Sequence, residues 1–252
     1  MSLKRPVVLI TGASRGIGAA LAQLAATRGY DVAINYRTER EEAERVAATC
    51  RASGAAVAIC AGDVSLEADV VRIFDEAQAV LGPLSHVVNN AGITGKSSRL
   101  DEADAATIET TIDINVLGAI FVAREASRRL SRRHGGLGGS IVNISAIAAR
   151  LGSAGEYVWY AASKGAVDAL TVGLAQELAS DGVRVNAVSP GITRTDIHER
   201  STGDAGRVER LRSKIPLNRV GEPGEVAEAV LFLMSDAAAY ITGANLPVSG
   251  GR

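Results

Sequence analysis

Three side chains in the middle of the chain have the types and spacing that proton transfer needs. Tyr160 and Lys164 are four residues apart, so on a helix they share one face. A phenol with a reference pKa of about 10 is a poor base at neutral pH, but a neighbouring ammonium stabilises the phenolate and lowers that pKa. Ser145 ends an apolar run upstream, and its hydroxyl can orient a carbonyl or alcohol oxygen. Together they predict a proton donor and acceptor beside a hydride carrier, as carbonyl–alcohol interconversion requires.

A glycine-rich turn near the N-terminus is suited to hold such a carrier. The apolar run Val7–Ile10 predicts a buried strand, and the Ala-rich segment that follows predicts a helix over about Gly16 to Arg28. Glycines 12, 16 and 18 let backbone N–H groups approach a pyrophosphate at the helix N-terminus. The spacing is G-x-x-x-G-x-G, so it matches the mechanism of the G-x-G-x-x-G motif and not its spelling. An ordinary strand-to-helix turn is the alternative.

Strand-like and helix-like runs alternate along the rest of the chain, which predicts one α/β domain over residues 1–252 with a parallel sheet and helices on both faces. We find no linker and no short-period repeat. The further predicted strands are Asp31–Tyr36, Ala56–Ala61, Leu84–Asn89, Ser140–Ser145, Val183–Ser189 and Asn245–Val248.

The second predicted strand indicates the type of nucleotide. In dinucleotide-binding folds its carboxyl end faces the adenosine ribose, where an acid binds the 2′-hydroxyl of NAD and an arginine accommodates the 2′-phosphate of NADP. This strand has no acid at its tip, Arg37 stands just past it, and Arg15 lies in the glycine turn. The pattern favours NADP, with NAD as the alternative cofactor. Two solvated surface arginines are the other interpretation.

Polar residues at other strand ends are compatible with a nucleotide site. Asp63 could accept a hydrogen bond from the adenine amino group, or could cap the next helix. The small residues of Asn89–Gly92 would let a cofactor lie close, although Asn is also a routine turn residue. Asn115 stands within an apolar helical stretch, so its amide needs a partner, either a buried backbone group or a water.

Composition and charge exclude several classes of protein. The 252 residues are 47% hydrophobic, but no run approaches the roughly 18 apolar residues of a membrane span. The net charge of −1 argues against nucleic acid or an anionic membrane as partner. The start of the chain has no signal-peptide pattern, which favours a cytoplasmic location. Cys50 and Cys60 have neither disulfide nor zinc-ligand spacing, so we expect inert thiols and no metal site.

Taken in order, the motifs resemble those of the classical short-chain dehydrogenase/reductase family over essentially the whole chain. The resemblance implies a Rossmann fold, a doubly wound parallel sheet of about seven strands in the order 3-2-1-4-5-6-7. Each motif alone is only modestly specific, whereas the ordered set is very specific. The motifs are Thr11-Gly12-x-x-x-Gly16-x-Gly18, Asn89-Asn90-Ala91-Gly92, Asn115, Ser145, Tyr160-x-x-x-Lys164 and Pro190-Gly191.

The same resemblance implies a role for each catalytic residue. Tyr160 would be the general acid/base, and Lys164 would lower its pKa and hold the nicotinamide ribose. Ser145 would position the substrate oxygen, and Asn115 would hold a water in a proton relay. The implied cofactor-binding residues are Gly12, Ser14, Arg15, Gly16, Ile17, Gly18, Asn35, Tyr36, Arg37, Asp63, Val64, Asn89, Ala91, Gly92, Tyr160, Lys164, Pro190, Gly191, Ile192 and Thr195.

The sequence leaves the substrate open. The family resemblance allows 3-oxoacyl-thioester reduction, sugar or polyol oxidation, and ketone reduction. A long polar insertion at about 193–215, at the edge where ligands bind, predicts a lid over a small carbonyl or alcohol. A homo-oligomer, tetramer or dimer, is implied in the same way. A nucleotide-sensing protein without catalysis is a rival that the complete set of catalytic residues opposes. A sugar-nucleotide epimerase is opposed by the short chain and the glycine spacing.

Overall fold

The computed structural model describes residues 5–204 and 206–252, and at its centre lies a parallel sheet of seven strands. The strand order β3-β2-β1-β4-β5-β6-β7 is the predicted one, with every pair parallel. The sequence had placed the ends of several strands one or two residues away. The strands are β1 (Val7–Ile10), β2 (Asp31–Tyr36), β3 (Val57–Ala61), β4 (His86–Asn89), β5 (Gly139–Ile144), β6 (Val183–Pro190) and β7 (Asn245–Val248).

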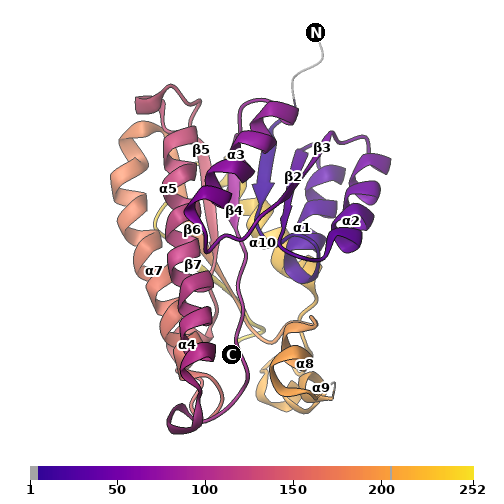
Figure 1. The fold of residues 1–252 in the computed structure, drawn as a ribbon, viewed down its shortest axis with the longest axis vertical. Coiled ribbons are helices and arrows are strands. Elements are labelled where there is room, and N and C mark those ends of the chain that lie inside the picture. Colours follow the sequence, from indigo (N-terminus) through magenta and orange to yellow (C-terminus); the bar gives the residue numbers. More distant parts are fainter. Residues whose placement is uncertain (1–4, 205) are drawn as a thin grey trace.

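Helices cover both faces of this sheet (Figure 1). On one face α1 (Gly16–Thr27), α2 (Arg40–Ala52) and α10 (Pro223–Met234) pack their buried side chains against the strands. On the other face α3 (Glu67–Leu81), α5 (Ala119–Leu130) and α7 (Val158–Leu178) do the same. The central strands are therefore apolar on both faces, as uninterrupted runs such as that of β1 predict.

Three helical segments follow one another without a break. They are α4 (Ala105–Ile112), a π-helix over Asp113–Gly118, and α5. The sequence predicted an apolar helical stretch around Asn115 and did not predict the π-helix within it. The combined stretch, with a best-window mean hydropathy of 1.4, is the one helix among the described residues long and apolar enough to cross a membrane. Its buried side chains on α5 belong to the core beneath the sheet.

The two cysteines lie in the two halves of the core. Cys50 is on α2 and Cys60 on β3, and both side chains are fully buried. Burial raises the pKa of Cys50 to about 11 and that of Cys60 to about 12. Both thiols therefore stay protonated at neutral pH, in keeping with the prediction that they are inert.

All strands end at the same edge of the sheet because they are parallel and nearly in register. Beyond this edge lie α6 (Ala148–Leu151) and the segment that the sequence predicted as a lid. The lid segment folds into α8 (Ile197–Thr202) and α9 (Arg207–Arg210), followed by a 3₁₀ turn over Arg212–Lys214 (Figure 1, orange). The insertion is thus ordered by short helices at the edge where ligands of α/β proteins bind.

His86 at the start of β4 predicts a pH dependence of stability. Its Nδ1 lies 2.8 Å from Ser140 Oγ, and burial lowers its pKa to about 4. In the unfolded chain its pKa is about 6.5. The neutral form of His86 therefore contributes its full share to the free energy of unfolding above pH 6.5. As the pH falls from 6.5 toward 4, this contribution, about 3 kcal/mol, is lost.

We expect the His86→Gln variant to lack this pH-dependent part of the free energy of unfolding. Chemical denaturation of both proteins at pH 7.0, 5.5 and 4.5 measures it as the difference between their unfolding free energies, so that titration of the other groups cancels. A difference that stays constant over this range would contradict the assignment to His86.

Candidate active site

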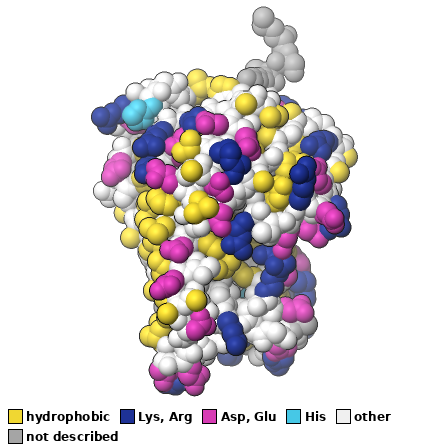
Figure 2. All heavy atoms as spheres, viewed as in Figure 1, with side chains coloured by type: hydrophobic (Ala, Val, Ile, Leu, Met, Phe, Trp, Pro, Cys, Tyr) yellow, Lys and Arg dark blue, Asp and Glu magenta, His cyan; other side chains and the backbone are white. Residues whose placement is uncertain are grey.

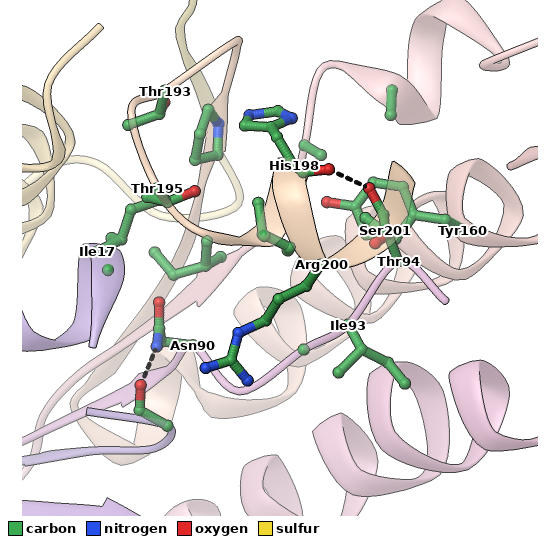
Figure 3. A pocket seen from close by; sticks show the side chains of 18 of the residues that line it. Ile17, Asn90, Ile93, Thr94, Tyr160, Thr193, Thr195, His198, Arg200 and Ser201 are labelled. Carbon is green, nitrogen blue, oxygen red and sulfur yellow. Dashed lines mark hydrogen bonds between the residues drawn. The ribbon is translucent and has the colours of Figure 1, made fainter. Parts of the chain in front are cut away.

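A cavity of about 750 Å³ runs along the carboxyl edge of the sheet, between the glycine turn and the lid. Figure 3 shows its lining: Ile17 at the start of α1, Asn90 after β4, Tyr160 on α7, and Thr195, His198 and Arg200 from the lid segment. The volume lies within the range typical of cofactor and small-molecule sites. Of the residues predicted for catalysis and cofactor binding, all but Asn89 and Asn115 line this cavity.

The glycine turn leaves its backbone open to the cavity. Gly12 and Gly16 have φ values of +62° and +54°, in the left-handed region that favours glycine. A Cβ on Gly18 would lie 2.5 Å from the carbonyl oxygen of Gly12 and 2.6 Å from Asn90 Nδ2. The α1 N-terminus therefore packs directly on the turn, and residues of both line the cavity. This geometry fits the pyrophosphate of a dinucleotide.

Tyr160 and Lys164 lie together on α7, one turn apart, and both face the cavity. Lys164 Nζ is 5.8 Å from the centre of the Tyr160 ring and donates a hydrogen bond to the carbonyl oxygen of Ile144, at 2.8 Å. Its side chain is buried, and this burial lowers the pKa of Lys164 to about 8.

The expected lowering of the Tyr160 pKa is wrong for this arrangement. Burial, together with the neighbouring Tyr157, raises the pKa of Tyr160 above its ordinary value. The loss of hydration on burial is the larger of these two causes, and the hydrogen bond of the Lys164 ammonium goes to Ile144. At neutral pH Tyr160 is therefore protonated, which is the state of a proton donor.

Ser145 follows β5 and reaches the same wall of the cavity. Its Oγ lies 2.5 Å from Asp168 Oδ1 and 3.2 Å from the carbonyl oxygen of Lys164. The same Asp168 oxygen accepts a hydrogen bond from Asn245 Nδ2, at 2.7 Å. Sequence reasoning missed Asp168, although it stands four residues after Lys164 and continues the face of α7 that carries Tyr160.

Asn115 is buried in the π-helix and does not line the cavity. Its amide exchanges two hydrogen bonds with the backbone of Ile93, at 2.9 and 2.7 Å, and donates a third to Ser163 Oγ at 3.0 Å. The partners that this buried amide requires are thus supplied by the backbone of Ile93 and the hydroxyl of Ser163. The amide fixes the loop after β4 against α7, next to Gly92, where a Cβ would lie 3.1 Å from Asn115 Oδ1.

Asn89, the asparagine expected beside the cofactor, does not line the cavity, whereas its neighbour Asn90 does. Asn89 is buried and donates to the carbonyl oxygen of Ala119 and to Asn143. Asn90 lines the cavity instead and donates to the carbonyl oxygens of Thr11 and Gly12. Successive residues at a strand end point in opposite directions, so only one of the two can face the cavity.

The predicted adenosine end of the cavity contains the expected residues from β2 and β3. Asn35 is buried and holds the glycine turn, because its Oδ1 accepts a hydrogen bond from the Gly12 N–H at 3.2 Å. Arg37 is half-exposed and reaches Asp63 only loosely, at 3.5 Å. Its guanidinium is free to turn toward a ligand. The remaining predicted residues that line the cavity are Ser14, Ile17, Tyr36, Val64, Ala91, Gly92, Pro190, Gly191, Ile192 and Thr195.

A carboxylate to which the sequence analysis gave no role lies beside Arg15 and Arg200. Glu39, three residues past the end of β2, accepts hydrogen bonds from Arg15 at 3.2 Å and from Arg200 of the lid at 2.9 Å. Asp196 contacts the same two arginines, at 2.9 and 2.7 Å. Figure 3 shows Arg200 extending from α8 into the cavity. This four-membered ion network joins the lid to the glycine turn across the cavity mouth.

A second ion pair lies at the other end of the cavity, next to Tyr160. Arg207 of α9 contacts Glu156 at 2.7 Å and donates to Tyr157 Oη at 3.2 Å. The rings of Tyr157 and Tyr160 meet edge to face, with centroids 5.5 Å apart. Within the described ranges, Arg207 Nε is buried without a hydrogen-bond partner. The wall nearest the catalytic candidates is therefore polar and charge-paired.

Comparison with known proteins assigns the family. A family model described as enoyl-(acyl carrier protein) reductase matches residues 12–252. The uncharacterised oxidoreductase YgfF of Escherichia coli (strain K12) is 44% identical over 246 residues, covering 98% of this chain and 99% of that protein.

Two solved structures extend the comparison to the fold. The 3-ketoacyl-(acyl-carrier-protein) reductase from Brucella melitensis, complexed with NADH, has a TM-score of 0.90 at 32% identity and covers 100% of this chain and 99% of its own. A short-chain dehydrogenase from Burkholderia cenocepacia J2315 in complex with NADP has a TM-score of 0.89 at 34% identity and covers 98% and 97%. The chain therefore belongs to the short-chain dehydrogenase/reductase family of oxidoreductases.

Proposed function

We propose that the protein interconverts a carbonyl and a secondary alcohol with NADP(H), and that Tyr160 is its general acid/base. The observation that carries the proposal is the meeting of Tyr160, Lys164 and Ser145 in one cavity with the bare glycine turn. The rival without catalysis would not need a protonated phenol, a buried ammonium and a hydroxyl at the same wall.

In the reducing direction the chain supplies the proton and the orientation. A nicotinamide nucleotide bound on the glycine turn supplies the hydride. Tyr160, protonated at neutral pH because burial raises its pKa, donates its proton to the oxygen of the carbonyl as that oxygen becomes negative. Ser145 orients this oxygen, and Lys164 provides positive charge one helical turn below the phenol.

The raised pKa of Tyr160 also affects how the rates of reduction and oxidation depend on pH. Carbonyl reduction uses the protonated phenol and alcohol oxidation uses the phenolate. We therefore propose that reduction is favoured near pH 7, and that oxidation becomes faster as the pH rises and the phenol loses its proton.

Replacing the phenol hydroxyl tests the core of this proposal. We expect Tyr160→Phe to lower kcat by about 100- to 10,000-fold, the usual contribution of a general acid, with little change in NADPH affinity. A panel of ketones, sugars, polyols and 3-oxoacyl thioesters, with NADPH absorbance as readout, first identifies a substrate. Tyr240→Phe is the matched control, since Tyr240 is fully exposed. Full turnover by Tyr160→Phe would exclude the proposed role.

The preference for NADP over NAD is a separate proposal, supported by Arg37. Its guanidinium is half-exposed and loosely held, so a 2′-phosphate could recruit it at little cost. Arg15 is less available than the sequence suggested, because Glu39 and Asp196 already bind it. Glu39 would also repel a phosphate. The preference is therefore the balance between Arg37 and this carboxylate, with NAD as the alternative.

Two substitutions measure the opposing effects of Arg37 and Glu39 one at a time. We expect Arg37→Ala to weaken NADPH binding roughly 10-fold, because one charge-assisted contact is worth about 1.5–3 kcal/mol, and to leave NADH binding unchanged. Glu39→Gln should strengthen NADPH binding several-fold, because it removes a charge that repels the 2′-phosphate and one of the two carboxylates that bind Arg15. Nucleotide fluorescence titration measures both affinities, and Arg40→Ala, an exposed arginine of the same segment, is the control. Tighter binding of NADH than of NADPH to the unmodified protein would refute the preference.

The substrate end of the cavity supports a small, polar substrate. Glu156, Tyr157 and Arg207 offer acceptors and donors side by side, which suits hydroxyl-bearing carbonyls and alcohols better than a long acyl chain. The 3-oxoacyl-thioester reductase and the sugar or polyol dehydrogenase stay as the two alternatives, and the substrate panel distinguishes them. The lid segment, held by Arg200 and Arg207, would close over this end.

The surface of the molecule is compatible with a protein that binds no nucleic acid and forms a homo-oligomer. Figure 2 shows acidic and basic side chains interspersed over the face that it draws, which does not favour nucleic acid. Leu117, Ile120 and Val172 are exposed on the α5 and α7 side, where the apolar side chains would support a homo-oligomer, a tetramer or a dimer. A cytoplasmic location remains part of the same proposal.

A further inference from the structure

Asp168 lies behind the catalytic candidates and is hydrogen-bonded to one of them, Ser145. It follows Lys164 by one turn of α7, so Tyr160, Lys164 and Asp168 form one line along the helix. Its Oδ1 is 2.5 Å from Ser145 Oγ, a short distance typical of a hydroxyl donating to an ionised carboxylate. Neither the comparisons nor the motifs assign this residue a role.

The proton of Ser145 has two neighbours, and both are acceptors. They are the carboxylate of Asp168 and, at 3.2 Å, the carbonyl oxygen of Lys164. A serine hydroxyl has one proton and two lone pairs, so donation to Asp168 leaves only lone pairs for the cavity. In this arrangement Ser145 offers lone pairs to the O–H of an alcohol, and in the reducing direction its proton turns from Asp168 to the carbonyl oxygen.

Asn245 on β7 holds the carboxylate in place. Its Nδ2 donates to Asp168 Oδ1 at 2.7 Å, while its Oδ1 is buried with no hydrogen-bond partner in the part of the chain that the structure describes. A buried unpaired oxygen costs free energy. The amide cannot turn over to satisfy it, because its oxygen would then face the carboxylate. The orientation of Asn245 is therefore set by Asp168.

The carboxylate also acts on Lys164 through its charge. Burial disfavours the ammonium, and Asp168 opposes this by raising the pKa of Lys164. Tyr160, whose ring centre lies 5.8 Å from this ammonium, has a raised pKa and is neutral at pH 7, and so is Tyr157, which packs against Tyr160. Asp168 is thus the negative group that sustains the charge of Lys164.

We propose that Asp168 is a positioning residue of the active site, which accepts the hydrogen bond of Ser145 and favours the charged form of Lys164. The proposal rests on the proposed function for its effect on turnover, but its effect on Lys164 does not. The chain has only four lysines, Lys4, Lys96, Lys164 and Lys214, so Lys164 can be observed by itself.

The first test therefore needs no substrate. Protein labelled with [ε-¹³C]lysine is titrated by NMR, and the Lys164 signal is assigned by its loss in Lys164→Met. We expect this lysine to titrate near pH 8 in the unmodified protein and at least half a pH unit lower in Asp168→Asn. Glu177→Gln, which removes an exposed carboxylate from the same helix, should leave the titration unchanged. An unchanged titration in Asp168→Asn would overturn the electrostatic part of the proposal.

The second test uses the substrate found for the unmodified enzyme. We expect Asp168→Asn and Asp168→Ala to lower kcat about 10-fold, to shift its pH profile, and to leave the Kd for NADPH within twofold. A lower melting temperature with an unshifted pH profile would mean that Asp168 is merely structural. If the unmodified protein reduced no carbonyl at all, the proposed function would fail, while the NMR titration would still decide whether Asp168 supports Lys164.

Discussion

The site depends on one buried ammonium. Lys164 has only 4% of its surface exposed, and an unpaired charge in such a place is costly. Two groups make its position tolerable. One is the carbonyl oxygen of Ile144, where β5 ends, and the other is the carboxylate of Asp168 on its own helix. The ammonium thereby ties α7 to the sheet edge, and with it the phenol that stands one turn away.

Close packing of backbone determines the other half of the cavity. Gly18 packs on Gly12 at a distance that no side chain would allow, and Gly92 packs closely on Asn115. Asn35 and Asn90 then hold the glycine turn by hydrogen bonds from β2 and from the loop after β4. The result is a floor of closely packed backbone in the same cavity as Tyr160, Lys164 and Ser145. Such close packing suits a site that must hold two reactants at short distance.

The mouth of the cavity differs from this floor in its chemistry. Ion pairs at its two ends, one around Glu39 and Arg200 and the other around Glu156 and Arg207, attach the lid to the rest of the domain. The Glu39–Arg200 pair is partly exposed, so each of its contacts contributes little and can be exchanged for contacts to a ligand. The lid is therefore built from interactions that a charged cofactor or a polar substrate can replace.

The sequence by itself determined the fold and most of the site. Strand and helix periodicity, the glycine spacing and the Tyr160–Lys164 pair are local features, and a parallel sheet necessarily brings the carboxyl ends of its strands to one edge. Tertiary structure alone decided which polar groups meet there. Contacts between residues 20 or more positions apart decide which of Asn89 and Asn90 lines the cavity and which groups bind Asn115. Such contacts also decide the roles of Glu39 and Asp168. Side-chain direction at a strand end, and the hydration that a group loses on burial, are set by those neighbours and not by local spacing, which is why the pKa of Tyr160 is raised and not lowered.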